Sequence, residues 1–260
     1  IIHTGGLGDF LQLLPVLRGI RQRHPGAEVH LVGRPEWAVL AKRAHLADRV
    51  TAFETSGLHR LFVRGAPFDQ ACPAVAGADV ILSFLPDETF RANLARLTGA
   101  RAISARSFPR PGETGIPAAR YVYDRVAHEL DLPASDAVPR LPLPDDPAVS
   151  ASVADRVSCT RDCVAVHPGS GSPEKNWPLA NFHRLCKRFR EGGLSPVWLL
   201  GPAEMEREEF APLQELDACL AGASLAEVAA LLATVCLYVG GDNGVTHLAS
   251  AVGTPTVALF

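Results

Sequence analysis

Three segments of the chain combine glycines with polar side chains where a predicted strand gives way to a predicted helix. The first is HTGGLGDF (3–10), in which three glycines, Gly8 among them, lie just before Asp9 at a helix start. Glycine lets the backbone bend and lets a ligand approach it closely, and a helix N-terminus offers unpaired N–H groups to an anion. Alternatively, Asp9 only caps the helix and the glycines serve a tight turn.

The second segment, HPGSGSPEKNWP (167–178), is rich in small and hydroxyl residues and ends in a predicted helix. A lysine beside a flexible Gly/Ser loop is a suitable ligand for a diphosphate, although the full P-loop pattern is absent. The alternative is a solvated surface loop. The candidate ligand-binding residues of this segment are Ser170, Gly171, Ser172 and Lys175.

The third segment, GGDNGVTHLASAVGTPTVALF (240–260), has a Gly-Gly pair followed by polar residues at a helix start. Its candidate residues are Asp242, Asn243, Gly244 and His247. Asp242 or Asn243 could serve only as a helix cap, and His247 only as a packing residue. The second and third segments both lie in the C-terminal half, and the acidic junction around Asp9 lies in the N-terminal half. This arrangement favours a nucleotide diphosphate ligand in the C-terminal half.

Composition argues against several other classes of protein. A net charge of −3 and a pI near 6.3 give no general attraction to nucleic acid. The six cysteines are expected to be reduced, and Cys159-x-x-x-Cys163 has no second pair at matching spacing, so no metal site is predicted. No apolar run approaches the roughly 20 residues that span a bilayer, so a cytoplasmic protein is expected. The chain begins at Ile1 rather than Met, which leaves open whether residues precede it.

Short apolar runs alternate with helical patterns along the chain, which is typical of an α/β protein with parallel sheets. The dinucleotide pattern G-x-G-x-x-G is absent, so a nicotinamide cofactor is not expected. The predicted strands are 1–4, 28–32, 49–53, 80–84, 101–104, 164–167, 196–200, 237–239 and 256–260. The predicted helices are 9–23, 36–44, 88–97, 118–130, 178–190, 204–213, 224–233 and 244–251.

A proline-rich stretch separates the two halves. LPASDAVPRLPLPDDP (132–147) contains five prolines, which interrupt helices and sheet ladders and favour extended backbone. The sequence therefore predicts two domains, 1–140 and 141–260, joined by a linker, with the ligand in a cleft at the carboxyl ends of the strands.

The three junctions belong to longer stretches that resemble one family. The stretches are GGLGDFLQLLPVLRGIRQRHPGAEVHLV, VAVHPGSGSPEKNWPLANFHRL and YVGGDNGVTHLASAVGTPTVALF. Together they resemble glycosyltransferase family 9, the ADP-heptose:lipopolysaccharide heptosyltransferases, over nearly the whole chain. The resemblance implies a GT-B fold with two Rossmann-like domains that face a central cleft. It also implies inverting, metal-independent transfer of a heptose from an ADP-sugar to the lipopolysaccharide core, with contact at the cytoplasmic face of the inner membrane.

The resemblance also implies roles for particular residues. The catalytic aspartate of the family falls on Asp9, and the lysine that contacts the donor phosphates falls on Lys175. The position that tends to hold the ribose falls on Glu204, with Glu206 as an alternative. The polar residues after the Gly-Gly pair would surround the diphosphate and the sugar: Asp242, Asn243, Gly244 and His247.

The chain differs from the family at two places. The chain has Pro86-Asp87 where members often show an Asp-x-Gln-Gly-x-x-Lys-like sequence, and it ends at Phe260 where relatives usually continue. The alternatives are a GT-B transferase with a UDP-sugar or a non-lipopolysaccharide acceptor, and a non-catalytic protein that binds a nucleotide sugar. No cofactor is expected beyond the ADP-sugar as co-substrate.

Overall fold

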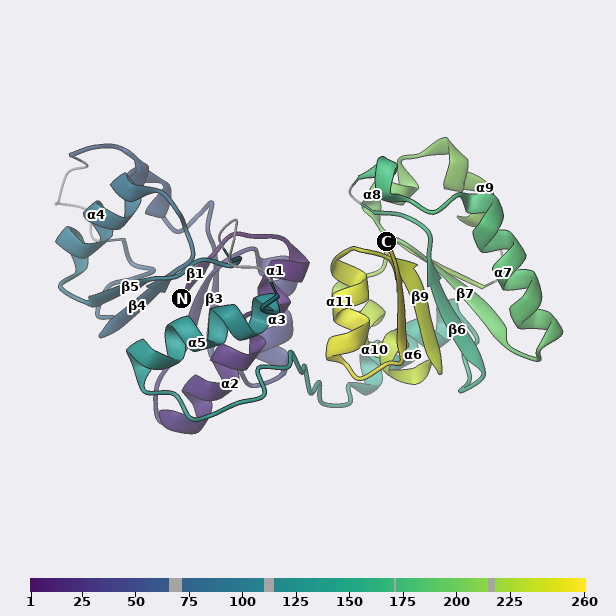
Figure 1. Ribbon diagram of the computed structural model, residues 1–260, viewed down its shortest axis with the longest axis horizontal. Coiled ribbons are helices and arrows are strands. Elements are labelled where there is room, and N and C mark those ends of the chain that lie inside the picture. The colour runs from purple at the N-terminus through teal and green to yellow at the C-terminus, as the bar shows by residue number, and fades with distance from the viewer. Residues whose placement is uncertain (66–71, 110–114, 171, 215–217) are drawn as a thin grey trace. The chain divides into compact units, whose positions relative to one another are not determined.

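The computed structural model describes residues 1–65, 72–109, 115–170, 172–214 and 218–260, and the chain divides into two compact units. The first unit spans Ile1–Leu141 and the second spans Pro142–Phe260. Each contains one parallel five-stranded sheet with helices on both of its faces (Figure 1). Among the described helices, none combines the length and the apolar character needed to cross a membrane.

The sheet of the first unit has the strand order β3-β2-β1-β4-β5, and every pair is parallel. Helix α4 and the 3-10 helix η1 cover one face, and α2 and α5 cover the other (Figure 1). The elements are β1 (Ile2–His3), α1 (Leu7–Leu11), α2 (Leu14–Arg23), β2 (His30–Gly33), α3 (Pro35–Arg43), β3 (Arg49–Ala52), η1 (Leu58–Phe62), β4 (Val80–Ser83), α4 (Glu88–Thr98), β5 (Arg101–Ser104) and α5 (Ala118–Leu130).

The sheet of the second unit has the strand order β10-β9-β6-β7-β8, and again every pair is parallel. Its elements are α6 (Pro147–Arg156), β6 (Cys163–His167), η2 (Pro173–Lys175), α7 (Leu179–Glu191), β7 (Ser195–Leu200), α8 (Pro202–Met205), η3 (Glu208–Phe210), α9 (Ala211–Gln214), β8 (Cys219–Ala221), α10 (Leu225–Thr234), β9 (Leu237–Gly241), α11 (Gly244–Ala251) and β10 (Thr256–Leu259).

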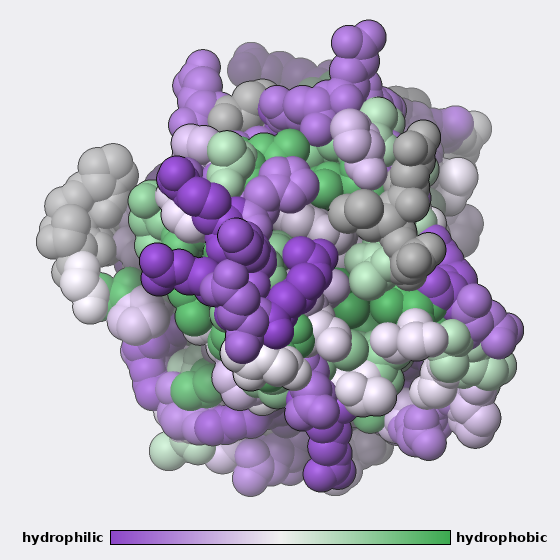
Figure 2. All heavy atoms as spheres, turned by 90° about the vertical axis from the view of Figure 1, so that its right-hand side faces the viewer, coloured by the Kyte–Doolittle hydropathy of each residue, from purple (hydrophilic) through white to green (hydrophobic). Residues whose placement is uncertain are grey.

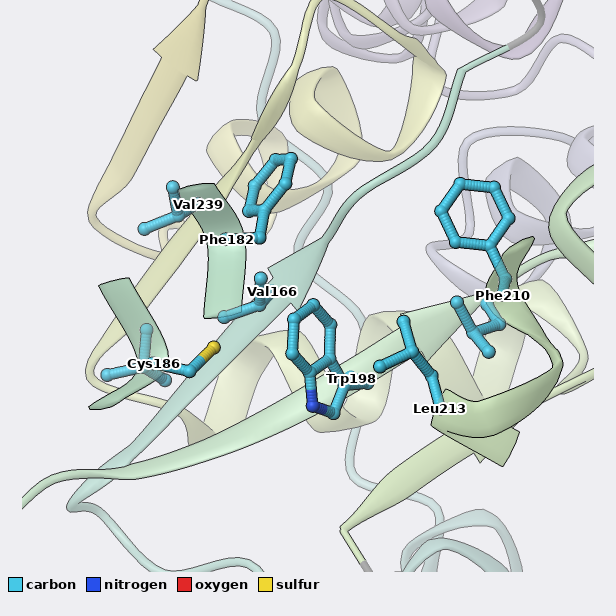
Figure 3. Close-up of a cluster of buried hydrophobic side chains, with 9 residues drawn as sticks. Val166, Phe182, Cys186, Trp198, Phe210, Leu213 and Val239 are labelled. Carbon is cyan, nitrogen blue, oxygen red and sulfur yellow. The ribbon is translucent and has the colours of Figure 1, made fainter. Parts of the chain in front are cut away.

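The core of the second unit fixes the sheet against its helices. All five residues of β6 are buried, as expected for a central parallel strand that is covered on both faces. Val166 and Trp198 from neighbouring strands pack with Phe182 of α7, and Phe210 and Leu213 extend the same cluster (Figure 3). Figure 2 shows the face of this unit that lies at the right of Figure 1, where hydrophilic side chains predominate and smaller hydrophobic patches lie between them.

Two predicted helices differ in the structure, and one helix of the structure was not predicted. The single helix expected over 9–23 is two helices, α1 and α2, because Pro15 has no N–H to donate to the carbonyl one turn earlier. The helix expected over 204–213 is divided into α8, η3 and α9, since Arg207 has extended backbone. Helix α6 was not predicted, because Asp146 and Pro147, which serve as its cap and first residue, were assigned to the linker.

The predicted linker is largely part of the first unit. Residues 132–146 form neither helix nor strand, but Leu141 is buried, and the guanidinium of Arg18 donates to the Val138 carbonyl at 3.2 Å. The hydroxyl of Tyr123 donates to the carbonyl of Pro133. Prolines therefore predicted the absence of regular structure correctly, whereas the packing of this segment depends on side chains of α2 and α5.

Candidate functional site

In the second unit, the loops that follow β6 and β9 start side by side. These strands are neighbours in the sheet, with Val166 opposite Val239 and His167 opposite Gly240. Because the pairing is parallel, both strands end at the same edge of the sheet, where ligands bind in open α/β folds. Sheet pairing thus brings together two candidate segments that lie about 70 residues apart in the chain.

Asn243 links these two loops. Its Oδ1 accepts hydrogen bonds from the N–H groups of Val245 and Thr246 at 2.9 and 3.0 Å, so it is the N-cap of α11. Its Nδ2 donates at 3.0 Å to the carbonyl of Gly169, in the loop after β6. One side chain therefore fixes the start of α11 relative to the loop that the sequence predicts to bind phosphate.

Buried polar groups also stabilise the turn between β9 and α11. The hydroxyls of Tyr238 and Thr246 lie 3.0 Å apart, and the Thr246 hydroxyl also donates to the Gly241 carbonyl. Burial raises the pKa of Tyr238, so its hydroxyl stays neutral. Neither side chain was a candidate site residue in the sequence, although a tyrosine in the strand before the Gly-Gly pair and a threonine in the helix after it could have indicated this contact.

The loop after β6 is held by its own side chains. The Oγ of Ser170 accepts the Ser172 N–H at 3.2 Å and lies 2.7 Å from the Ser172 carbonyl and 2.8 Å from Oδ1 of Asn176. Ser170 is buried, so its hydroxyl orders the loop instead of pointing to solvent. Lys175 is exposed, and its backbone N–H donates to the Ser172 carbonyl at 3.0 Å. Gly171 lies outside the described residues.

Glu204 lies directly against the same loop. A Cβ atom on Gly169 would be 2.0 Å from its Oε1, and its Oε2 accepts the Gly201 N–H at 2.9 Å. The side chain is buried, in the first turn of α8. Glu206, the alternative ribose ligand, is exposed at the end of that helix. The structure thus places Glu204 beside the candidate phosphate loop, with one carboxylate oxygen used to hold the N-terminus of α8.

Two further candidate residues flank the start of α11 and are accessible. Oδ1 of Asp242 lies 3.8 Å from Nε2 of His247, and both side chains are a little over 40% exposed (44% and 43%). An exposed pair of this kind contributes little stability. Both side chains can therefore face a ligand at this helix N-terminus, next to Gly244, the first residue of α11.

The first unit carries Asp9 at the carboxyl edge of its own sheet. Asp9 lies in the first turn of α1, together with Gly8, and its Oδ2 accepts the Gly6 N–H at 3.1 Å. His3, the last residue of β1, is buried nearby, and a Cβ on Gly5 would contact both its ring and the Asp9 carboxylate. Burial lowers the pKa of His3 to about 4, so this ring is neutral beside the carboxylate.

The groups at these two edges can bind an anion and accept a proton. The second unit offers the N-terminus of α11, the lysine Lys175 and the loop after β6, a set that suits a diphosphate. The first unit offers a half-exposed carboxylate, which can serve as a general base for a hydroxyl group. Among the residues that the structure describes, no three His, Cys, Asp or Glu side chains are grouped so that they could hold a metal ion.

Comparison with known proteins shows the family. The family model described as glycosyltransferase family 9 (heptosyltransferase) matches residues 112–260. The chain is 31% identical, over 281 residues, to lipopolysaccharide heptosyltransferase 1 of Pseudomonas aeruginosa, an alignment that covers 100% of this chain and 77% of that protein. The chain belongs to glycosyltransferase family 9. The resemblance seen in the sequence is confirmed, and the protein is a glycosyltransferase.

Solved structures of family 9 proteins have the same fold. A family 9 glycosyltransferase from Veillonella parvula matches with a TM-score of 0.74 and 18% identity, covering 99% of this chain and 79% of that chain. The E. coli heptosyltransferase WaaC, solved with ADP-2-deoxy-2-fluoro heptose, matches with a TM-score of 0.68 and 18% identity, covering 99% and 86%. These likenesses and the two parallel sheets confirm the predicted GT-B fold class with its two Rossmann-like domains.

Proposed function

We propose that this family 9 protein moves a heptose, or a similar sugar, from an ADP-sugar to a glycan acceptor of the lipopolysaccharide-core type. The two loops that Asn243 links carry this proposal, because they lie beside the N-terminus of α11, whose backbone N–H groups suit a nucleotide diphosphate. The full-length similarity to a lipopolysaccharide heptosyltransferase supports the sugar and the acceptor class. Such an acceptor is anchored in a membrane, so the proposal includes contact with the cytoplasmic face of the inner membrane.

In this proposal the two units have different roles. The second unit holds the ADP-sugar, with Lys175 and the N-terminus of α11 on the diphosphate and Glu204 near the ribose. The leaving diphosphate gains negative charge in the transition state, so donors aimed at it lower the barrier. The first unit holds the acceptor, and Asp9 removes the proton of the attacking hydroxyl as the nucleotide leaves from the opposite face of the sugar, which inverts the anomeric centre.

Two measurements test the proposal together. ADP and ADP-sugars should raise the melting temperature more than UDP or GDP and their sugars, since a ligand at 100 times its dissociation constant adds about 2.7 kcal/mol. Asp9→Asn keeps an amide oxygen that can accept the Gly6 N–H but removes the base. We expect unchanged stability and turnover lower by roughly 10²–10⁴-fold. Stronger stabilisation by UDP, or near-normal turnover of the variant, contradicts the donor or the base respectively.

A further inference from the structure

The hydroxyl of Tyr238 lies beside the start of α11, inside the second unit. Tyr238 belongs to β9 and is 0% exposed. Residues 238 and 240 point to the same face of the sheet, because side chains alternate along a strand. A Cβ atom on Gly240 would lie 2.3 Å from the Tyr238 hydroxyl oxygen. The missing side chain of Gly240 therefore leaves the space through which the ring extends to α11, the helix that packs on β9 (Figure 1).

The hydroxyl of Thr246 has one proton and three oxygen neighbours. These are the Gly241 carbonyl, the Tyr238 hydroxyl at 3.0 Å and Oδ1 of Asn243 at 3.3 Å. The Gly241 carbonyl is the closest of the three, and Oδ1 of Asn243 already accepts two backbone N–H groups. Thr246 therefore donates to Gly241, and the neutral Tyr238 hydroxyl donates to Thr246. The result is a chain of two hydrogen bonds with a fixed direction, from Tyr238 through Thr246 to Gly241.

This chain of hydrogen bonds connects the turn between β9 and α11 to the strand before it. Gly241 is the last residue of β9, and Thr246 lies in the first turn of α11. Between them lie residues 242–244, which the proposed function places around the donor. If Tyr238 donates no proton, the buried Oγ1 of Thr246 has one hydrogen bond fewer, and its own proton can turn from Gly241 towards Asn243.

We propose that Tyr238 is a positioning residue for the nucleotide-sugar donor: through Thr246, its hydroxyl holds the turn 241–243 and the N-terminus of α11 in the arrangement that binds the diphosphate. Tyr238 cannot touch a ligand itself, since it is fully buried. A site whose groups are already held in place loses less freedom on binding and so binds more tightly. The inference rests on the proposed function, which assigns the donor to the second unit, and adds a residue that acts on the donor from inside the fold.

The test compares two buried tyrosines that each donate one hydrogen bond. Tyr238→Phe removes only the hydroxyl that begins the chain. Tyr123→Phe makes the same change in the first unit, where Tyr123 donates to the Pro133 carbonyl, and serves as the matched control. Thr246→Val removes the middle hydroxyl of the chain, whereas Thr246→Ser keeps it. Calorimetry gives the affinity for ADP, and thermal unfolding gives the stability.

We expect both Phe variants to melt at a lower temperature than the unaltered protein, because each loses one hydrogen bond. The Kd for ADP should rise about fivefold in Tyr238→Phe and stay within about twofold in Tyr123→Phe. It should rise at least as much in Thr246→Val, and Thr246→Ser should recover most of that loss. Adding Tyr238→Phe to Thr246→Val should weaken ADP binding by less than about twofold more, because the chain is already broken.

Two results overturn the inference. One is an affinity for ADP in Tyr238→Phe that matches the affinity of Tyr123→Phe, which would leave Tyr238 with a purely structural role. The other is full additivity of Tyr238→Phe and Thr246→Val, which would mean that the two hydroxyls act independently. If Tyr238→Phe does not fold, the contrast between Thr246→Val and Thr246→Ser decides instead, and equal affinities for ADP in these two variants overturn the inference.

Hydrogen exchange separates this inference from the proposed function. If the unaltered protein binds no ADP, the proposed donor is wrong, and exchange at the amides of Val245 and Thr246 in the free protein then decides the positioning role alone. Exchange that accelerates at these amides in Tyr238→Phe but not in Tyr123→Phe supports that role. Equal rates in the two variants overturn it.

Discussion

Asn243 offers a sharp test of whether the two loops of the second unit form one ligand site. Its side chain makes two kinds of hydrogen bond that can be removed separately. Oδ1 accepts the N–H groups of Val245 and Thr246 and so caps α11, and Nδ2 donates to the Gly169 carbonyl. Asn243→Ser retains a good capping oxygen but cannot reach and donate to Gly169, whereas Asn243→Ala removes both functions. Comparing Asn243→Ser with the unaltered protein therefore measures the bridge, and comparing the two variants with each other measures the cap.

The hydrogen bonds set the expected size of each effect. Losing an N-cap side chain costs about 1 kcal/mol, and an unsatisfied acceptor costs about 1–3 kcal/mol when it is buried, as Gly169 is. We therefore expect Asn243→Ser to lose about 1 kcal/mol of stability and Asn243→Ala about 2 kcal/mol or more. If the bridge preorganises the site, a loss of about 1 kcal/mol also weakens ADP binding by roughly fivefold in both variants.

Three measurements check this prediction. Urea unfolding gives the stabilities, and calorimetry gives the affinity for ADP. Hydrogen exchange at the amides of Val245 and Thr246 reports the cap itself, and it should accelerate in Asn243→Ala but not in Asn243→Ser. If Asn243→Ser binds ADP as tightly as the unaltered protein while Asn243→Ala is only less stable, Asn243 is a helix cap and the bridge to Gly169 plays no part in the site.

Three further predictions concern a glycine, a histidine and a lysine. Gly169→Ala should destabilise the protein and weaken ADP binding, because the new Cβ would lie 2.0 Å from Oε1 of Glu204; Gly26→Ala, with open space around it, is the control for both melting temperature and affinity. The low pKa of His3, about 4 against 6.5, means that only the unfolded state takes up the proton between those values. Stability should therefore fall by roughly 3 kcal/mol as the pH drops from about 6.5 to 4, and His3→Gln should remove that part of the pH dependence of urea unfolding. Turnover should survive excess EDTA within about twofold, whereas Lys175→Ala should lose about tenfold or more; abolition by EDTA and restoration by Mg²⁺ or Mn²⁺ would show that the diphosphate is neutralised by a metal ion instead.

Most helices and strands could be predicted from the sequence, because the hydrophobic patterns and turn residues that specify them lie within each element or next to it. Short apolar runs that alternate with helical patterns located every strand except the short β8 (Cys219–Ala221) in the part of the chain that the structure describes. The predicted helix boundaries were wrong at two places where a single proline determines where a helix begins. Pro15 divides the first predicted helix, and Pro147 begins a helix instead of ending a linker, since proline is tolerated in the first turn and excluded further in.

The α/β class, the two halves, the family resemblance and the three candidate junctions could all be predicted from the sequence. Each of these depends on residues close together in the chain, or on motifs whose order is preserved. Gly-rich turns before helices can be recognised without knowing what lies beside them, because the need for a flexible backbone and a free helix N-terminus is a local requirement.

Which distant candidate residues lie side by side could be seen only in the folded chain. The bridge from Asn243 to Gly169 exists because β6 and β9 pair in one register, and a shift of that register would separate the two loops. A cavity of about 220 Å³ in the first unit is formed in the same way, since it is lined by Arg91 of α4, Arg106 after β5 and Arg125 of α5. Strand pairing and helix packing depend on how the apolar surface of the whole chain is buried. They therefore involve residues far apart in the sequence and cannot be read from any short stretch of it.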